Sequence, residues 1–364
     1  MSNEHPYIPT VAITHGDPGG IGYEVILKAF EDELMFDICT PVLFGSAKIL
    51  SAYRKMLGLN TQYNVIQNIG EARPGVLNVI NCIPEDFVFE PGKSSAETGQ
   101  AALASLEAAA EAVKNGELDV LVTAPINKKN IQSDTFVFPG HTEYLESIAG
   151  DDAKALMVLT SENIRVAPVT THLPLSAVPA AITEDLIVEK IRVFNHSLHR
   201  DFGIHHPRIA VLSLNPHAGE DGLLGNEEND IIIPAIARAK EERIMVFGPY
   251  AADGFFGSGR FVKFDGVLAM YHDQGLAPFK VMAMDSGVNF TAGLPWVRTS
   301  PDHGTAYDIA GRGEASPESM RHSIYEAVDI FRNRMRDDEA HRNPLKRQEG
   351  YDKRKNNSDN LPAE

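Results

Sequence analysis

Short apolar runs alternate with amphipathic stretches along most of the chain. The runs rich in Val, Ile and Leu predict strands at residues 11–14, 41–45, 76–81, 118–123, 155–159, 164–170, 208–214 and 265–270. Continuous runs of this kind are typical of strands that are buried on both faces. Residues 98–114 form the clearest amphipathic helix, which is expected to end at Asn115-Gly116. The alternation predicts an α/β fold with a largely parallel sheet.

The length of 364 residues favours two domains. A polar stretch near residues 130–137 suggests a boundary, and the chain is expected to return to the first domain near residue 285. We therefore predict a discontinuous first α/β/α domain at 1–135 plus 285–335, and a second at 136–284. Residues 336–364 are polar and are expected to be a disordered tail.

Composition excludes several classes of protein. Two cysteines, Cys39 and Cys82, are too few for a disulfide framework or a cysteine-ligated zinc site. The sequence shows neither a signal peptide nor an apolar segment of about 18 residues, so a cytoplasmic protein without membrane contact is expected. The net charge of −17 opposes nucleic-acid binding, which requires phosphate neutralisation. An anionic substrate would need a local cationic pocket.

Polar motifs follow many of the predicted strands. In open α/β sheets ligands bind beyond the carboxyl ends of the strands, so these motifs are expected to converge on one active-site edge. Seven segments have this character: HGDPGGIG, APINK, FPGHTEYL, THLPL, NPHAGEDGLLGNEE, YHDQGLAPFK and RTSPDHGTAYDIAG. The glycine spacing of the first does not fit the Gly-x-Gly-x-x-Gly dinucleotide fingerprint. Its glycines could contact a ligand or serve the backbone, and the sequence does not decide which.

Three histidines, His172, His217 and His272, each follow a predicted strand. Three imidazoles with one open position describe a catalytic metal site, although a single loop histidine is more often a surface residue. The sequence contains no HExxH or similar local motif that would by itself indicate a metal site. Cationic groups that could form an anion pocket are Lys128, Lys280, Arg298 and His141.

Taken together, the segments resemble the 4-hydroxythreonine-4-phosphate dehydrogenase family of vitamin B6 biosynthesis. The matching strings are GDPGGIGYE, VTAPINK, GHTEYL, THLPL, LNPHAGEDGLLGNEE, YHDQGLAPFK and VNFTAGLPWVRTSPDHGTAYDIAG, in order from residue 16 to 311. The resemblance implies two α/β/α lobes with a cleft between them, as in the related isocitrate and isopropylmalate dehydrogenases. It also implies a homodimer whose active site is shared across the interface.

The resemblance further assigns residues to roles. It places one divalent metal ion (zinc, cobalt, manganese or magnesium) on His172, His217 and His272, with one histidine supplied by the partner subunit and the metal and dimer contacts in the second domain. Contacts to a small phosphorylated substrate fall on His141, Thr142, Lys280, Asn289 and Arg298. The adenosine part of NAD or NADP falls on His303, Gly304, Thr305 and Ala306. The candidates for the catalytic base are Asp273, Asp253 and Lys280.

The implied reaction is oxidation of 4-phosphooxy-L-threonine and decarboxylation to 3-amino-2-oxopropyl phosphate. The alternatives are a sister dehydrogenase of 4-phospho-threonate or 4-phospho-erythronate, a metal hydrolase, and a non-catalytic binding protein. The sequence departs from the usual family pattern at a few positions: His15 replaces Met, Tyr23 replaces Pro, GLAPFK deviates slightly before Lys280, and Gly254 replaces Thr. The last change removes a hydroxyl beside the presumed substrate, so the identity of the substrate stays open.

Overall fold

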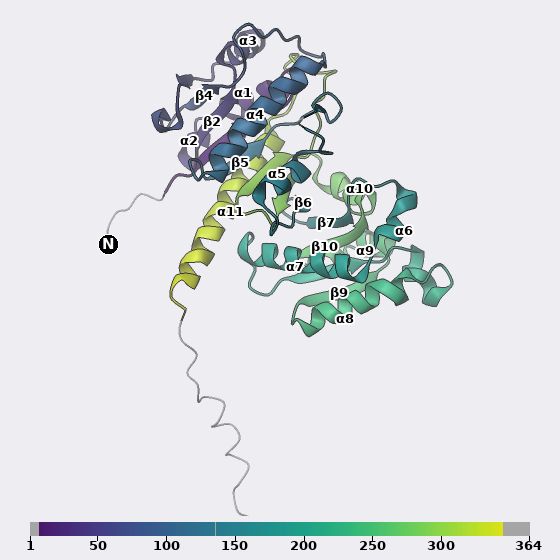
Figure 1. Cartoon of the computed structure of the whole chain (residues 1–364). Coiled ribbons are helices and arrows are strands. Elements are labelled where there is room, and N and C mark those ends of the chain that lie inside the picture. Colours follow the sequence, from purple (N-terminus) through teal and green to yellow (C-terminus); the bar gives the residue numbers. More distant parts are fainter. Residues whose placement is uncertain (1–6, 135, 345–364) are drawn as a thin grey trace, which may run out of the picture.

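A computed structural model describes residues 7–134 and 136–344 as two α/β lobes that share one twelve-stranded sheet (Figure 1). The strands are β1 (Thr10–Thr14), β2 (Thr40–Gly45), β3 (Tyr63–Ile66), β4 (Leu77–Asn81), β5 (Val120–Thr123), β6 (Leu156–Thr160), β7 (Arg165–Thr170), β8 (Arg208–Leu212), β9 (Met245–Tyr250), β10 (Gly266–Tyr271), β11 (Val288–Ala292) and β12 (Val297–Pro301).

The direction of the strands reverses in the middle of the sheet. The order is β3-β4-β2-β1-β5-β12-β11-β6-β7-β10-β8-β9. Pairing is parallel from β3 to β12 and again from β7 to β9, whereas β11 is antiparallel to both β12 and β6, and β6 is antiparallel to β7. These antiparallel pairs divide the sheet into two parallel halves that run in opposite directions. The predicted largely parallel α/β fold is confirmed.

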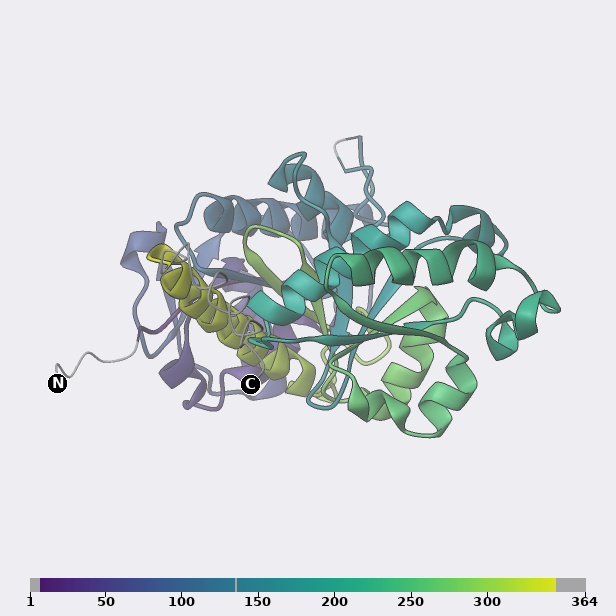
Figure 2. The ribbon, with the colours of Figure 1, turned by 90° about the horizontal axis from the view of Figure 1, so that it is seen from below.

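Helices cover both faces of the sheet (Figure 2). They are α1 (Gly22–Ala29), α2 (Met35–Ile38), α3 (Ala47–Leu57), α4 (Ala96–Lys114), α5 (His141–Ala149), α6 (Val178–Ala181), α7 (Glu184–Arg200), α8 (Ile233–Glu241), α9 (Ala252–Gly257), α10 (His272–Ala283) and α11 (Glu318–Arg342). In β1, Val11 and Ile13 pack against the helices of one face and Ala12 against those of the other, which is the period-two pattern of a strand buried on both sides. Within the described residues, every helix is too short or too polar to cross a bilayer.

The eight predicted strands are all present, within a few residues at each end. Four strands were missed. Strands β3 and β9 lie at the two edges of the sheet and are partly exposed, so they lack a continuous apolar run. Strands β11 and β12 are buried but carry polar side chains, which tertiary contacts satisfy: Thr299 Oγ1, for example, donates to the Ser323 carbonyl at 2.7 Å.

The predicted disordered tail begins too early. Residues 336–342 belong to α11, whose inner face contributes Ile324 and Val328 to the core. Near its end, Arg334 forms a buried ion pair with Asp201 at 2.6 Å. Because only one stripe of this helix is buried, its sequence is polar overall. The last turns therefore resembled a disordered tail in the sequence. Residues 345–364 lie outside the described residues, and the division into two domains stays a prediction.

The departure at His15 lies in the core of the first lobe. His15 and Tyr23 are both fully buried, and their rings stack with centroids 4.9 Å apart. Tyr23 in turn stacks on Tyr53, whose ring lies 5.7 Å away. Burial lowers the pKa of His15 to about 3, so the imidazole is neutral at physiological pH.

Acid should therefore destabilise the protein through His15. In the unfolded chain a histidine has a pKa of about 6.5. Because the folded pKa is lower, the unfolded state binds the proton first, and stability falls as the pH drops from 6.5 towards 3. At pH 5 the loss amounts to about 2 kcal/mol relative to pH 7. His15→Met preserves an apolar volume and should remove this loss.

The measurement is urea unfolding of wild type and His15→Met at pH 7 and pH 5. The exposed His206→Met variant is the control for losing a histidine anywhere. If His15→Met and wild type lost the same free energy of unfolding between the two pH values, His15 would not be an acid-labile position.

Candidate active site

A pocket of about 300 Å³ lies where the strand direction reverses. Five of the seven polar segments supply side chains to it, from the ends of β5, β7, β10 and β12 and from the start of α5. Its lining residues are Thr123, Ala124, Pro125, Ile126, Lys128, Gly140, His141, Thr142, Glu143, Met157, Leu159, His172, His272, Leu276, Lys280, Asn289, Arg298, Ser300, Pro301, Asp302, His303 and Gly304. The expectation of seven converging segments was too broad, because residues 16–22 and 215–228 do not line this pocket.

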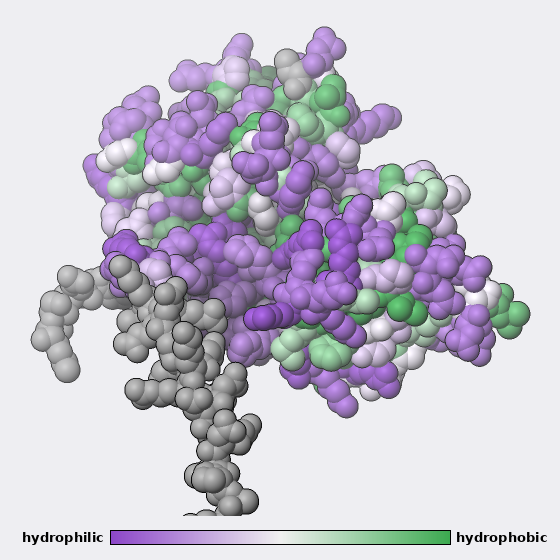
Figure 3. Space-filling view, turned by 60° about the horizontal axis from the view of Figure 1, so that its bottom comes forward, coloured by the Kyte–Doolittle hydropathy of each residue, from purple (hydrophilic) through white to green (hydrophobic). Residues whose placement is uncertain are grey.

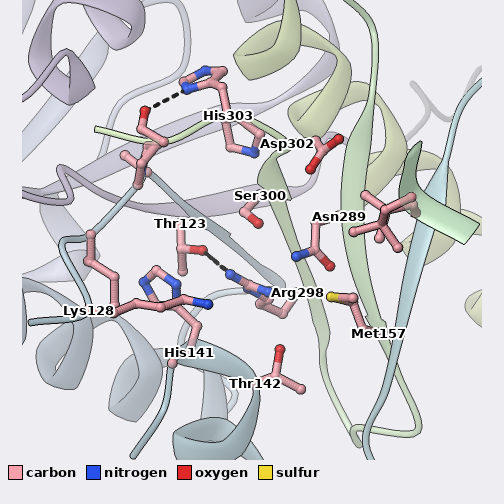
Figure 4. A pocket seen from close by; sticks show the side chains of 18 of the residues that line it. Thr123, Lys128, His141, Thr142, Met157, Asn289, Arg298, Ser300, Asp302 and His303 are labelled. Atoms are coloured by element: carbon pink, nitrogen blue, oxygen red, sulfur yellow. Dashed lines mark hydrogen bonds between the residues drawn. The ribbon is translucent and has the colours of Figure 1, made fainter. Parts of the chain in front are cut away.

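Arg298 is a buried cation that lines the pocket (Figure 4). Its side chain is only 2% exposed and comes from the second residue of β12. The guanidinium donates to Thr123 Oγ1 at 2.7 and 3.1 Å and to Thr291 Oγ1 at 3.0 Å. Within the described chain it forms no ion pair, and burial lowers its pKa to about 9. It remains a cation at neutral pH, and the nearby Glu143 carboxylate opposes the lowering of its pKa without forming an ion pair with it, so the guanidinium can still attract an anionic ligand.

His141, Thr142 and Asn289 lie around this cation (Figure 4). Burial, and after it the charges of Arg298 and Lys128, hold the pKa of His141 well below its usual value, so its ring is neutral. His141 Nε2 and Asn289 Oδ1 are both buried without a hydrogen-bond partner. Buried polar atoms are normally paired, so these two are free to meet polar groups of a ligand.

Lys280 and Asp302 close another side of the pocket. The Lys280 ammonium contacts Asp302 Oδ1 at 3.2 Å and donates to the Asp302 carbonyl at 3.0 Å. Burial raises the pKa of the Asp302 carboxyl although Lys280 opposes the shift. Next to it, His303 Nδ1 donates to the Gly304 carbonyl at 3.0 Å, which leaves His303 Nε2 unpaired. Burial lowers the pKa of His303.

His172 and His272 lie together at the rim, with ring centroids 6.3 Å apart. Each ring places Nδ1 against a carboxylate: His172 against Glu143 Oε1 at 3.0 Å, and His272 against Asp273 Oδ1 at 2.6 Å. A carboxylate at Nδ1 keeps the proton on that nitrogen and leaves Nε2 as the electron-pair donor, as in histidines that bind metals. The Lys128 ammonium already lies 3.0 Å from His172 Nε2.

His217 is not part of this group. It is exposed and begins five consecutive residues with left-handed backbone, with φ between 44° and 79°. Four of the five are not glycine, so the turn is strained and must be held by its surroundings. The buried Glu228 carboxylate holds it by accepting from the Leu214 and Asn215 amides, both at 2.8 Å. Among residues 7–134 and 136–344, no three histidine, cysteine or acidic side chains are arranged to bind a metal.

The remaining predicted residues do not line the pocket. Asp253 is exposed in α9 and accepts from the Gly254 amide at 2.7 Å, and the Asp273 side chain is 85% exposed. Thr305 and Ala306 follow the lining residue Gly304 without lining the pocket themselves. Sequence reasoning missed Glu143, Asp302 and Thr123 as site residues. All three belong to the motif segments, but nothing in the sequence around them distinguishes them as ligand-binding residues.

The sequence and the structure are both similar to those of known proteins. Residues 37–327 match the family of the pyridoxal phosphate biosynthetic protein PdxA. The chain is 54% identical to a 4-hydroxythreonine-4-phosphate dehydrogenase of Bacteroides thetaiotaomicron over 96% of each chain. It is 38% identical to a protein of Oceanobacillus iheyensis provisionally described as a D-threonate 4-phosphate dehydrogenase, over 88% of this chain and 98% of the other. The crystal structure of a 4-hydroxythreonine-4-phosphate dehydrogenase from Klebsiella pneumoniae superposes with a TM-score of 0.77 at 36% identity, over 91% and 99% of the two chains.

Proposed function

The chain belongs to the family of the pyridoxal phosphate biosynthetic protein PdxA, and from this premise we propose that it oxidises 4-phosphooxy-L-threonine with NAD or NADP. The C3 hydroxyl loses its proton and C3 loses a hydride, which gives a ketone β to the carboxylate. Loss of carbon dioxide then yields 3-amino-2-oxopropyl phosphate. The reaction is a step of vitamin B6 biosynthesis.

The buried cation Arg298 is the observation that carries this proposal. A guanidinium that is 2% exposed, without a carboxylate partner in the described chain, is costly unless a ligand supplies the anion. The substrate offers both a phosphate and a carboxylate, either of which fits the planar fork of an arginine. Its hydroxyl and amino groups suit the unpaired His141 Nε2 and Asn289 Oδ1.

The loop after β12 fits a dinucleotide. A Cβ added at Gly304 would meet no atom within 4 Å, so the backbone there is open to a large ligand. His303 Nε2 beside it is buried and unpaired. We propose that His303, Gly304, Thr305 and Ala306 hold the adenosine part of the cofactor. Bound NAD or NADP supplies the hydride acceptor.

His172 and His272 fit a divalent cation, since each has a carboxylate at Nδ1. The Lys128 ammonium at His172 Nε2 occupies a position where a metal would be coordinated. When bound, zinc, cobalt, manganese or magnesium would stabilise the negative charge that develops on the substrate oxygen. We propose His217 as the third ligand, supplied by a second copy of the chain because it is exposed and outside the pocket.

Exposed apolar side chains support such a homodimer. They occur on each segment that carries one of the three histidines. Leu175 is 68% exposed three residues after His172, Leu223 is 80% exposed six residues after His217, and Val281 is 88% exposed in the helix that begins at His272. We propose that these side chains join one apolar contact surface when two copies of the chain meet. The face in Figure 3 is mostly hydrophilic, with hydrophobic residues interspersed on both lobes.

Of the three candidate bases, Lys280 is the one that lines the pocket. Its ammonium and Asp302 form one unit, in which the raised pKa of Asp302 makes its carboxylate a better proton acceptor. We propose that this pair receives the proton of the C3 hydroxyl, and that His141 and Asn289 orient the substrate. Asp273 acts by holding the ring of His272, and Asp253 contributes only if the partner brings it close.

A sister activity on 4-phospho-threonate or 4-phospho-erythronate is the second candidate. It is favoured by the 38% identity to the Oceanobacillus iheyensis protein and by Gly254, which replaces a hydroxyl-bearing residue of the family pattern. These substrates keep the phosphate and carboxylate that Arg298 requires. They lack the amino group.

The test is a side-by-side assay of nicotinamide reduction with the three substrates, each with NAD and with NADP. The proposal predicts the highest kcat/KM for 4-phosphooxy-L-threonine and the release of carbon dioxide. A higher kcat/KM for 4-phospho-threonate or 4-phospho-erythronate would establish the sister activity instead. Turnover of none of the three would refute both.

A further inference from the structure

The glycine-rich loop at residues 16–22 carries a buried charge that no described residue neutralises. Asp17 is fully buried, and no lysine, arginine or histidine of the described chain forms an ion pair with it. Only neutral groups surround its carboxylate. Oδ1 accepts from the Gly19 amide at 2.8 Å, and Oδ2 lies 2.6 Å from Asn130 Nδ2 and 2.8 Å from the Tyr307 hydroxyl. Thr98 Oγ1 is a fourth donor at 3.1 Å.

These donors come from three separate parts of the chain. Thr98 belongs to the capping box that starts α4, Asn130 to the loop after β5, and Tyr307 to the loop after β12. The carboxylate of Asp17 is thus the common acceptor that ties three loops together. Burial of a carboxylate is tolerated only when hydrogen bonds satisfy it, so the position of each donor is fixed.

The backbone of the loop is packed against the same neighbours. A Cβ at Gly20 would lie 2.7 Å from the Thr305 carbonyl oxygen, and one at Gly19 would lie 2.0 Å from the Lys93 carbonyl oxygen. The Ile21 amide donates to the Thr305 carbonyl at 3.0 Å. The glycines therefore allow close approach between loops.

The amides of this loop are not available for a phosphate. Those of Asp17, Gly19, Gly20 and Ile21 all donate within the protein, to Pro125, to the Asp17 side chain, to the Asp17 carbonyl and to Thr305. A glycine-rich loop that binds phosphate must leave its N–H groups free. Residues 16–22 consequently serve as packing and hydrogen-bonding partners of the loop after β12.

We propose that Asp17 is a positioning residue for dinucleotide binding, acting through Tyr307 on residues 303–306. This inference rests on the proposed function, in which that loop holds the adenosine part of the cofactor. Ala306 has a left-handed backbone with φ of 44°, which is strained for a residue with a side chain. The contacts of Thr305 with Ile21 and of Tyr307 with Asp17 flank this residue and hold it in place.

The test is Tyr307→Phe, which removes only the hydroxyl that donates to Asp17 Oδ2. The expected result is a KM for the dinucleotide about tenfold higher, because the loop must be ordered when the cofactor binds. The kcat at saturating cofactor and the KM for the phosphorylated substrate should change by less than about twofold. Asp17→Asn should raise the dinucleotide KM at least as much, because it disturbs the other donors to this carboxylate as well. The double variant should then raise it by less than the two single effects combined, since both variants remove the Tyr307 contact.

Two further measurements make the outcome decisive. Tyr325→Phe, on the outer side of α11, is the matched control and should leave every constant unchanged. Amide hydrogen exchange of residues 302–307 without any ligand should be faster in Tyr307→Phe than in wild type. An unchanged dinucleotide KM in Tyr307→Phe overturns the proposal. If wild type turns over no dinucleotide, the proposed function fails instead, and exchange then decides whether Asp17 holds the loop.

Discussion

Arg298→Met should raise the KM for the phosphorylated substrate about a hundredfold, because the substrate loses its buried counter-charge. Arg298 is 2% exposed, and the lowering of its pKa from 12.5 to about 9 means that keeping it charged costs on the order of 5 kcal/mol at neutral pH. Methionine fills a similar volume without that cost. The variant should therefore melt at a temperature at least as high as wild type while binding substrate poorly.

The two readouts together separate function from folding. Steady-state kinetics give the KM, and thermal melts with and without substrate give the stability and the stabilisation by ligand. Arg165→Met is the matched control, since Arg165 is a partly buried arginine that lies 4.4 Å above the Phe202 ring and does not line the pocket. A normal KM in Arg298→Met would remove Arg298 from the anion site.

Alanine at His172, His217 or His272 should lower turnover about a thousandfold or more, because each substitution removes one ligand of the proposed cation. Metal content after dialysis, and calorimetric titration with the metal alone, should fall in the same three variants. His206→Ala, at an exposed histidine outside the pocket, should change neither. Full activity with unchanged metal content in all three variants would refute the site.

Mixing two inactive variants tests whether His217 is supplied by the partner. His172 and His272 lie on one chain 6.3 Å apart, whereas His217 does not line their pocket. A dimer of one His217→Ala chain and one His272→Ala chain would then contain one intact site of two. Random exchange of subunits should restore about a quarter of wild-type activity. Mixing His172→Ala with His272→Ala should restore none, because both defects lie in the same half-site.

The sequence by itself determined the fold class, most of the sheet and the pocket's main side chains. Continuous apolar runs predict buried strands because burial on both faces leaves no other pattern, and eight of the twelve strands followed. The motif strings placed His141, Lys280, Asn289 and Arg298, and all four line one pocket. Strands β11 and β12 were not predicted because they carry polar side chains. These side chains, Arg298 among them, are buried against residues that are distant in the sequence.

Only the tertiary structure decided how the segments meet. Sequence placed His217 beside His172 and His272 by analogy of position. The strand before His217, β8, is indeed parallel to β7 and β10, but the left-handed turn that follows it keeps His217 outside the pocket of the single chain. It left two readings of the glycines at 16–22, and the backbone oxygens of Lys93 and Thr305 at the Cβ positions favour close packing between loops. Hydrophobic periodicity is a local property that can be recognised in the linear sequence. Charge compensation, loop packing and the gathering of ligands depend on distances between residues far apart in the chain, which exist only once it has folded.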